Sequence, residues 1–360
     1  MQTDPTTFAH VHDLSAVESA IEAERNARIT VDNGLIAAVD ALAARVAALE
    51  QAQAPTPAPV ADLIAAIAGT PIGGILDCGG AAFDAPPAGF LLDRAITLRN
   101  VTLRSSVTTG AAFTGTLRVT APATVDTDVT VVGGFCGIVI DRVAATVRAS
   151  VRDTVYAGIL GLSVDGAIIE GATVDGVRPL NNANGWNAYG ITLTALSLQP
   201  VSKRSTIRGC IVRNVPTWHG IDTHGGEDLT IADNTISGCR RGIFLTNAPV
   251  RTVVNGNLLI CPTAVQQAMT PPGGAPTTWL TDVNGISVVG GSGSITNNTG
   301  TGWPAGRWWN PITPGAWAFA TLNLSGFWMN AGNYGMARRQ FADGWARPTW
   351  RSASAALASV

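Results

Sequence analysis

The stretch "HGIDTHGGEDLTIADNTISGCRRGIFLT", residues 219–246, contains the dipeptide Gly-Ile twice, 22 residues apart. The dipeptide or a close variant recurs along the chain, at Gly137-Ile138, Gly158-Ile159, Gly190-Ile191, Gly220-Ile221, Gly242-Ile243, Ala264-Val265 and Gly285-Ile286. Successive spacings are 21, 32, 30, 22, 22 and 21 residues. A β-rich repeat of about 22 residues is typical of one coil of a parallel β-helix, which buries its apolar face by stacking on its neighbours. The two wider spacings then correspond to coils with insertions.

Two further sets of residues follow the same repeat. Aliphatic residues recur at equivalent positions, with small polar residues between them: Ile207, Ile231 and Val254, then Cys210, Asn234 and Asn257, then Val212, Ile236 and Leu259. We expect inward residues of successive coils to form rows spaced by about 4.8 Å, the distance between neighbouring strands. Cys239 and Cys261, which are 22 residues apart, are predicted to stack as inward thiols.

The chain divides into four regions. Residues 1–50 are predicted to form an N-terminal anchor and coiled coil, because apolar residues keep one seven-residue phase at Leu14, Ile21, Leu35, Leu42 and Leu49. Such a stripe needs a partner, so we expect a homo-oligomer, with a trimer as the first choice; an amphipathic helix packed on its own chain is the alternative. Residues 51–62 are a Pro/Ala linker, 63–300 a capping helix followed by the β-helix, and 301–360 a Trp-rich C-terminal β module.

Composition excludes several classes of protein. Hydrophobic residues make up 46% of the chain and charged residues 13%, with a net charge of -2, which argues against a nucleic-acid partner. No apolar run reaches the ~20 residues of a membrane span, so membrane insertion is not expected. No signal peptide is visible, which favours synthesis in the bacterial cytoplasm. The 5 scattered cysteines indicate reduced thiols, and no metal or cofactor is expected.

The order of coiled coil, linker, capping helix, β-helix and aromatic tail resembles bacteriophage tailspikes and related receptor-binding spikes with a pectate-lyase-like right-handed parallel β-helix. It is also similar to head or tail spikes of gene transfer agents. The resemblance implies a spike on the surface of a phage or phage-like particle, attached to a capsid, tail or spike-base protein through residues 1–50. It further implies that the β-helix binds, and in some members cleaves, a capsular polysaccharide during host attachment.

The candidate site begins at "HGIDTH", residues 219–224. Residues two apart on a strand share a face, so with Ile221 inward we expect Asp222 and His224 to point outward. The run resembles the "YG(F)DPH" active-site motif of β-helix alginate epimerases and lyases: Asp222 and His224 match its acid and histidine, whereas His219 replaces its tyrosine.

Three functional readings follow. A lyase or epimerase would use His224 or His219 as the base, with Asp222 polarising it or neutralising a uronate. A glycoside hydrolase would pair Asp222 with Glu227 or Asp228, since it needs two carboxylates about 5 to 9.5 Å apart. The third reading is a non-catalytic polar turn that contacts sugar hydroxyls.

Two insertions adjoin this turn, "RPLNNANGWNAY" at 178–189 and "ALSLQPVSKR" at 195–204. Long loops on a rigid scaffold commonly carry function. A tryptophan offers a flat surface to a sugar ring, and asparagine offers both hydrogen-bond donors and acceptors. We therefore predict a carbohydrate-binding set of Trp186, Asn184, Asn187, Trp218, His219, Asp222, His224, Arg240 and Arg241. The arginines are predicted either to hold an acidic sugar at the rim or to be a solvated pair.

The C-terminal region contains seven of the ten tryptophans. We expect most of these side chains to be buried, within the chain or between subunits, because so large an exposed apolar patch would be adhesive. Asn333, Tyr334 and Gly335, followed by Arg338 and Arg339, resemble the "NYG" segment in C-terminal domains of phage fibres.

Overall fold

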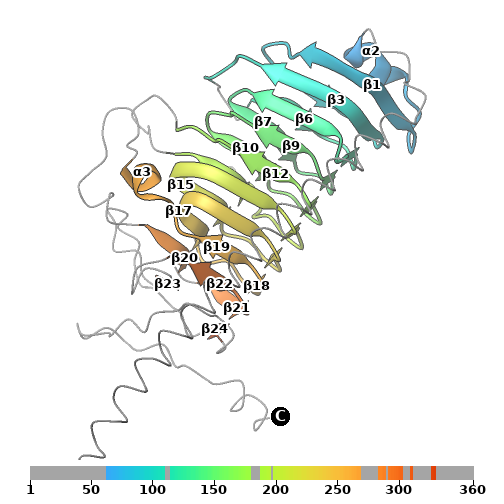
Figure 1. The fold of residues 1–360 in the computed structure, drawn as a ribbon. Coiled ribbons are helices and arrows are strands. Elements are labelled where there is room, and N and C mark those ends of the chain that lie inside the picture. The colour runs from blue at the N-terminus through green and yellow to red at the C-terminus, as the bar shows by residue number, and fades with distance from the viewer. Residues whose placement is uncertain are drawn as a thin grey trace, which may run out of the picture. The chain divides into compact units, whose positions relative to one another are not determined.

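The chain folds as a parallel β-helix in a computed structural model, as the repeat predicts. The structure describes residues 62–109, 114–179, 187–195, 198–268, 283–288, 291–302, 309–310 and 326–329. All strand pairings between its named strands are parallel, and Figure 1 shows the coils stacked from helix α2 at one end to strand β24 at the other. The predicted coiled coil at 1–50 and most of the predicted linker lie outside the described residues.

Each coil passes through three faces, which we call A, B and C. Face A consists of β2 (Phe90–Leu92), β4 (Gly115–Val119), β7 (Cys136–Asp141), β10 (Ala157–Leu162), β13 (Tyr189–Thr194), the second halves of β15 (Ile211–His224) and β17 (Thr235–Thr246), β20 (Asn284–Val288) and β23 (Trp309–Asn310). Face A carries every Gly-Ile dipeptide of the repeat.

Face B consists of the first halves of β1 (Ile75–Asp84) and β3 (Thr97–Ser105), then β5 (Thr124–Val125), β8 (Thr146–Val147), β11 (Ile168–Glu170), β14 (Thr206–Arg208), β16 (Thr230–Ala232), β18 (Thr252–Asn255), β21 (Ser292–Thr296) and β24 (Gly326–Met329). Face C consists of the second halves of β1 and β3, then β6 (Val129–Gly133), β9 (Ser150–Arg152), β12 (Thr173–Asp175), the first halves of β15 and β17, β19 (Leu258–Ile260) and β22 (Thr299–Thr301). Strands β1, β3, β15 and β17 thus bend from one face into the next.

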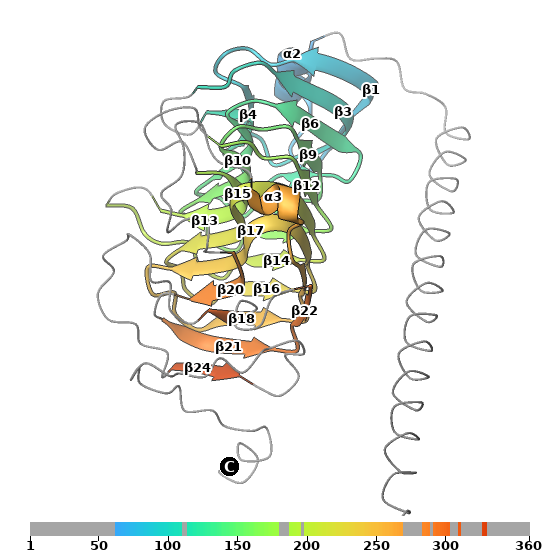
Figure 2. The ribbon, with the colours of Figure 1, turned by 60° about the vertical axis from the view of Figure 1, so that its left-hand side comes forward.

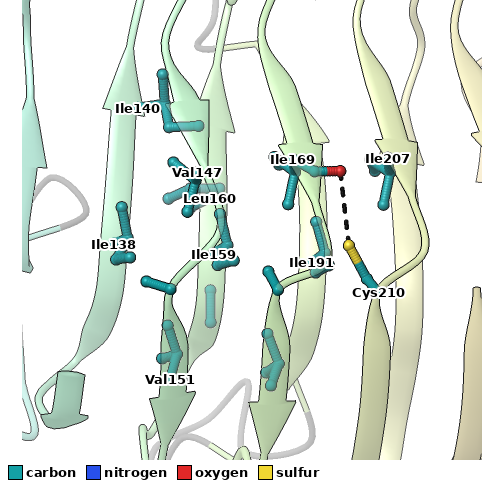
Figure 3. Close-up of a cluster of buried hydrophobic side chains, with 14 of the residues drawn as sticks. Ile138, Ile140, Val147, Val151, Ile159, Leu160, Ile169, Ile191, Ile207 and Cys210 are labelled. Carbon is teal, nitrogen blue, oxygen red and sulfur yellow. Dashed lines mark hydrogen bonds between the residues drawn. The ribbon is translucent and has the colours of Figure 1, made fainter. Parts of the chain in front are cut away.

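The Gly-Ile dipeptide aligns the coils on face A. Ile159 pairs with Ile191 and Ile191 with Ile221, although their spacings are 32 and 30 residues, so the extra residues lie outside the paired strands. Figure 3 shows Ile159 and Ile191 in one buried cluster with Val147, Val151 and Ile169 of the other two faces. A Cβ atom on Gly220 would lie 2.7 Å from the carbonyl oxygen of Gly242, too close for any side chain. Glycine is therefore required sterically where the coils approach each other most closely.

One member of the predicted repeat is wrong. Ala264 and Val265 lie in helix α3 (Ala264–Ala268), and Ile243 pairs directly with Ile286. The spacing of 43 residues between these isoleucines thus corresponds to one long coil instead of two. Helix α3 packs against β15 and β17, as Figures 1 and 2 show.

The ends of the described solenoid differ from each other. Helix α2 (Leu63–Gly69) packs on β1 and β2 of the first coil, with Leu63 and Ile67 buried and Asp62 capping its N-terminus. At the other end, β23 and β24 continue the parallel pairing beyond residue 300, where the sequence predicts the repeat to stop. No helix of the described residues is long and apolar enough to cross a membrane.

A row of buried asparagines joins the coils between faces B and C. The backbone N–H of Cys210 donates to Oδ1 of Asn234, that of Asn234 to Oδ1 of Asn257, and that of Asn257 to Oδ1 of Asn298. Each asparagine also donates through Nδ2 to a backbone carbonyl of the preceding coil. The row satisfies backbone groups at a corner where a strand pairing is interrupted, and it confirms the predicted alignment of Cys210 with the first two asparagines.

The predicted stack of Cys239 on Cys261 is wrong. Ser237 pairs with Ile260, so Cys261 lies one residue beyond this pair, whereas Cys239 lies two residues beyond it and pairs with Val215 instead. Cys239 is buried and Cys261 is half-buried. A spacing of 22 residues does not align these two cysteines, because β17 continues past Cys239 into face A, whereas β19 ends at Ile260, before Cys261.

Replacing Asn257 by Ala should lower the free energy of unfolding by about 3 kcal/mol, because it leaves the buried backbone N–H of Asn234 without its acceptor and removes the bond from Nδ2 of Asn257 to the carbonyl of Ile231. The midpoint of urea unfolding measures the change. The matched control is Asn255→Ala in the same coil, whose partners lie near the surface, with an expected loss below about 1 kcal/mol. Equal losses for the two variants would contradict a structural role specific to the buried row.

Candidate functional site

His219, Asp222 and His224 lie in the second half of β15, and their side chains meet. Nδ1 of His219 is 2.9 Å from Oδ1 of Asp222, and Nε2 of His224 is 2.8 Å from Oδ2. The hydroxyl of Thr192, one coil earlier, also donates to Oδ2 at 3.1 Å. The carboxylate of Asp222 is therefore the centre of a hydrogen-bonded cluster to which both histidines donate.

The outward orientation predicted for Asp222 does not make it accessible. Asp222 is 0% exposed and His219 1% exposed, whereas the side chain of His224 is 35% exposed. Strand β15 is buried without interruption from Thr217 to Thr223, so both of its faces are covered here. The alternation of an open strand therefore does not apply, and His224 alone of the three reaches solvent.

An irregularity in β15 places His219. Val215 pairs with Cys239 and His219 pairs with Arg241, so three residues of β15 lie opposite one residue of β17. Pro216 lies in this bulge, where its missing N–H breaks no ladder hydrogen bond. Such bulges re-aim side chains and are frequent beside functional sites.

Arg240 and Arg241 are neither at the rim nor solvated, contrary to both predictions, since they are 1% and 0% exposed. Nη1 of Arg241 lies 3.0 Å from Nε2 of His219. Its guanidinium carbon lies 4.6 Å from the ring centroid of Phe244 and 5.8 Å from that of Trp218. Arg241 is thus held between aromatic rings beneath the histidine cluster.

Aromatic rings surround the cluster. Trp218, predicted to contact sugar, is 3% exposed and stacks on His219 with ring centroids 4.6 Å apart. The ring of Tyr189 lies 5.8 Å from those of both His219 and His224. Trp218 therefore shapes the buried wall of the site instead of offering a flat surface to solvent.

Sequence reasoning missed Tyr189, Thr192 and Phe244, yet the repeat contained the signal. Tyr189 immediately precedes its Gly-Ile dipeptide, as His219 does, and these two residues are paired. Thr192 and Phe244 immediately follow theirs and pair with Asp222 on either side. Aligning every residue that flanks the dipeptide would have brought these side chains to the site.

The burial and charges of the cluster set its protonation. Burial raises the pKa of Asp222, but the charge of His224 and hydrogen bonds from both histidines outweigh it, so this pKa lies below its usual range. Burial lowers the pKa of His219 to about 3, against the opposing effect of Asp222. The charge of Asp222 raises the pKa of His224 above its ordinary value of 6.5, against burial. At neutral pH the cluster thus contains an ionised Asp222, a neutral His219 and a His224 whose protonated form the carboxylate stabilises.

The carboxylate pair of the hydrolase reading does not form. Glu227 bonds to Lys203 and Arg251, and Asp228 bonds to Arg251. Hydrogen bonds from Lys203 and Arg251 lower the pKa of Glu227, the opposite of what a general acid needs. Asp222 is inaccessible as a nucleophile, so the geometry does not favour hydrolysis by these acids.

The rest of the predicted carbohydrate-binding set is described in part. Trp186 and Asn184 lie outside the described residues. Asn187 is half-buried, and its Oδ1 has no hydrogen-bond partner within the described part of the chain. Among the residues that the structure describes, no group of three His, Cys, Asp or Glu side chains is placed to hold a metal ion.

Comparisons with known proteins point to the fold. No protein-family model matches the sequence, and no curated protein is similar to it. Among solved structures, the chain is similar to an alginate lyase from Paenibacillus sp. str. FPU-7, with a TM-score of 0.54 and 15% sequence identity. The match covers 76% of this chain and 93% of that chain. At this identity the likeness establishes the shared β-helix architecture alone.

Replacing Asp222 by Asn should lower the pKa of His224 below 6.5, because the charge that raises it is removed while burial remains. NMR titration of protein labelled at histidine measures this pKa. The control is Asp228→Asn, which removes a nearby surface carboxylate that pairs with Arg251. An unchanged pKa in Asp222→Asn would show that another group governs His224.

Proposed function

We propose that this β-helix binds an acidic bacterial surface polysaccharide at the part of face A where His224 reaches solvent. The observation that carries the proposal is the buried Asp222 bonded to both histidines, with His224 as its single exposed partner. Such a constellation is polar, desolvated and costly to assemble, which is typical of functional sites.

The sign of the local charge favours an acidic ligand. Asp222 contributes one buried negative charge, whereas the neighbouring coil contributes two buried positive charges, Arg241 beside His219 and Arg240 adjoining Arg241. Burial lowers the pKa of these arginines to about 10 and about 9, so both stay charged at neutral pH. Protonation of His224 adds a further positive charge at the accessible position. A uronate or another acidic sugar would complement this excess.

We place this binding site on a homo-oligomeric, trimeric spike of a phage or phage-like particle that attaches to a capsular polysaccharide of the host. The seven-residue repeat of residues 1–50 supports self-association, and we assign that region to contact with a capsid, tail or spike-base protein. The elongated stack of coils offers a long flank to a polymeric ligand, and the fold likeness to an alginate lyase is consistent with a polysaccharide ligand.

Binding of the wild-type chain to an acidic capsular polysaccharide should weaken as pH rises through the pKa of His224, above 6.5, because the protonated ring attracts the anion and the neutral ring does not. His224→Gln should bind about tenfold more weakly at the lower pH and lose the pH dependence, since a charge-assisted hydrogen bond contributes about 1.5 kcal/mol. Isothermal titration calorimetry measures the affinity. Arg208→Gln, a surface arginine paired with Glu170 on face B, is the control for general charge. Affinity that is independent of both pH and His224 would contradict the proposed site.

A polysaccharide lyase is the second candidate, because the Asp222–His224 pair also provides an accessible imidazole whose pKa the carboxylate raises, which strengthens it as a base. In β-elimination His224 would take the proton next to the uronate carboxylate, the bond to the leaving sugar oxygen would break, and a carbon–carbon double bond would form. That oxygen also gains a proton, which solvent water at the exposed side of His224 supplies. His219, at the motif position of the tyrosine, is buried, so it is not placed to donate to the sugar directly.

Shortening of the polysaccharide, together with growth of the ultraviolet absorbance from the new double bond, would establish lyase activity. We expect His224→Gln to abolish both signals. We also expect a polysaccharide whose carboxylates have been reduced to alcohols to resist cleavage, because the proton on the carbon next to the former carboxylate is no longer acidic. Shortening of the reduced polymer without absorbance would indicate hydrolysis instead. Binding with no shortening would assign the chain to attachment alone.

A further inference from the structure

We propose that Arg241 is a positioning residue that locks His219 in one neutral tautomer and so keeps the Asp222 carboxylate as an ionised acceptor for Nε2 of His224. The inference deepens the proposed function because it concerns the same site. The proton arrangement itself exists without any ligand, so it is tested independently of binding or cleavage.

The direction of each hydrogen bond follows from Arg241. A guanidinium only donates, so Nε2 of His219, 3.0 Å from Nη1, must be an unprotonated acceptor. A neutral imidazole then carries its proton on Nδ1, which donates to Oδ1 of Asp222 at 2.9 Å. Because Asp222 is ionised, Nε2 of His224 must be the donor in the 2.8 Å contact to Oδ2. Protons thus point from both histidines towards one carboxylate.

Packing prevents Arg241 from leaving this arrangement. Its side chain is 0% exposed, and its guanidinium carbon lies 4.6 Å from the ring centroid of Phe244. Trp218 stacks on the imidazole that the guanidinium contacts. The burial that excludes Arg241 from water leaves its pKa at about 9, so the side chain remains a charged donor at neutral pH. Both the guanidinium and the imidazole are therefore confined to the geometry of the hydrogen bond.

The proton arrangement determines which nitrogen of His224, the exposed member of the cluster, is available to a ligand. His224 uses Nε2 for Asp222, and Nδ1 has no hydrogen bond within the described part of the chain. Nδ1 is therefore the atom left to accept a proton from the ligand, or to donate one after His224 is protonated. Among the described residues, the charged and titratable groups packed around the pair are Tyr189 on β13 with Tyr156 against it, Asp222 and His219 on β15, and Arg241 on β17 with Arg240 adjoining it. Without Arg241, His219 could protonate at Nε2 and partly neutralise Asp222, which would weaken its effect on His224.

Magic-angle-spinning NMR of the full chain, labelled with ¹⁵N at histidine, reads the tautomer directly. Signals are assigned with His219→Gln and His224→Gln. In the wild type we expect His219 to stay neutral, with its proton on Nδ1, throughout the titration of His224. In Arg241→Met we expect His219 to take up a second proton or a mixed tautomer, and the proton affinity of His224 to fall about tenfold, which is one pKa unit. Arg241→Lys should restore the wild-type tautomer because lysine also donates.

Arg208→Met, a surface variant outside the site, is the control and should leave both histidines unchanged. A wild-type His219 with its proton on Nε2, or one protonated at both nitrogens at neutral pH, would overturn the proposal. So would an unchanged His219 in a folded Arg241→Met, with folding checked by circular dichroism. If Arg241→Met does not fold, the tautomer of His219 in the wild type and in Arg241→Lys still tests the proposal. Absence of polysaccharide binding would contradict the proposed function and leave this result intact.

Discussion

In-register stacking of successive coils is the constraint on which the rest of the structure depends. A backbone carbonyl of one coil lies so close to the glycine of the preceding one that a Cβ on Gly190 would be 2.4 Å from the oxygen of Gly220. Glycine at this position lets the strands of face A approach, and the adjoining isoleucines then stack without a gap. Insertions are tolerated only between strands, because any shift within a strand would displace a whole row of the core.

Stacking also creates the site. Tyr189, His219 and Arg241 each immediately precede a Gly-Ile dipeptide, so the register places them side by side although they are distant in sequence. The same register places Thr192, Asp222 and Phe244 in the row that follows the dipeptide. In other coils the same rows contain Cys136, Ala157, Val139 and Leu160. In the neighbouring coils of the site, the rows contain ionisable and aromatic side chains instead. The scaffold thus supplies the positions, and a local change of residue type supplies the chemistry.

The charges at these positions oppose the stability of the fold, which is why we regard them as functional. Burying an aspartate and two arginines removes strongly hydrated groups from water, and apolar residues fill the same rows elsewhere. The cluster persists because donors surround Asp222 and aromatic rings enclose Arg241. Charged residues replace apolar ones in these rows, yet the carboxylate of Asp222 is fully hydrogen-bonded. Such a departure from the repeat is expected where function outweighs packing.

The sequence by itself determined the parallel β-helix and placed Asp222 and His224 on one face, because a period of about 22 residues and a two-residue spacing on one strand are local properties. It did not determine that His219 meets them, since a register shift in β15 precedes that residue. It did not determine burial: Asp222, Trp218 and the two arginines are inaccessible because β15 is covered on both faces, which depends on neighbouring coils. Nor did it determine that Ala264 would enter a helix or that Cys239 and Cys261 would fall out of register. Tertiary structure alone decided these points, since they depend on where each coil bends and what packs against it.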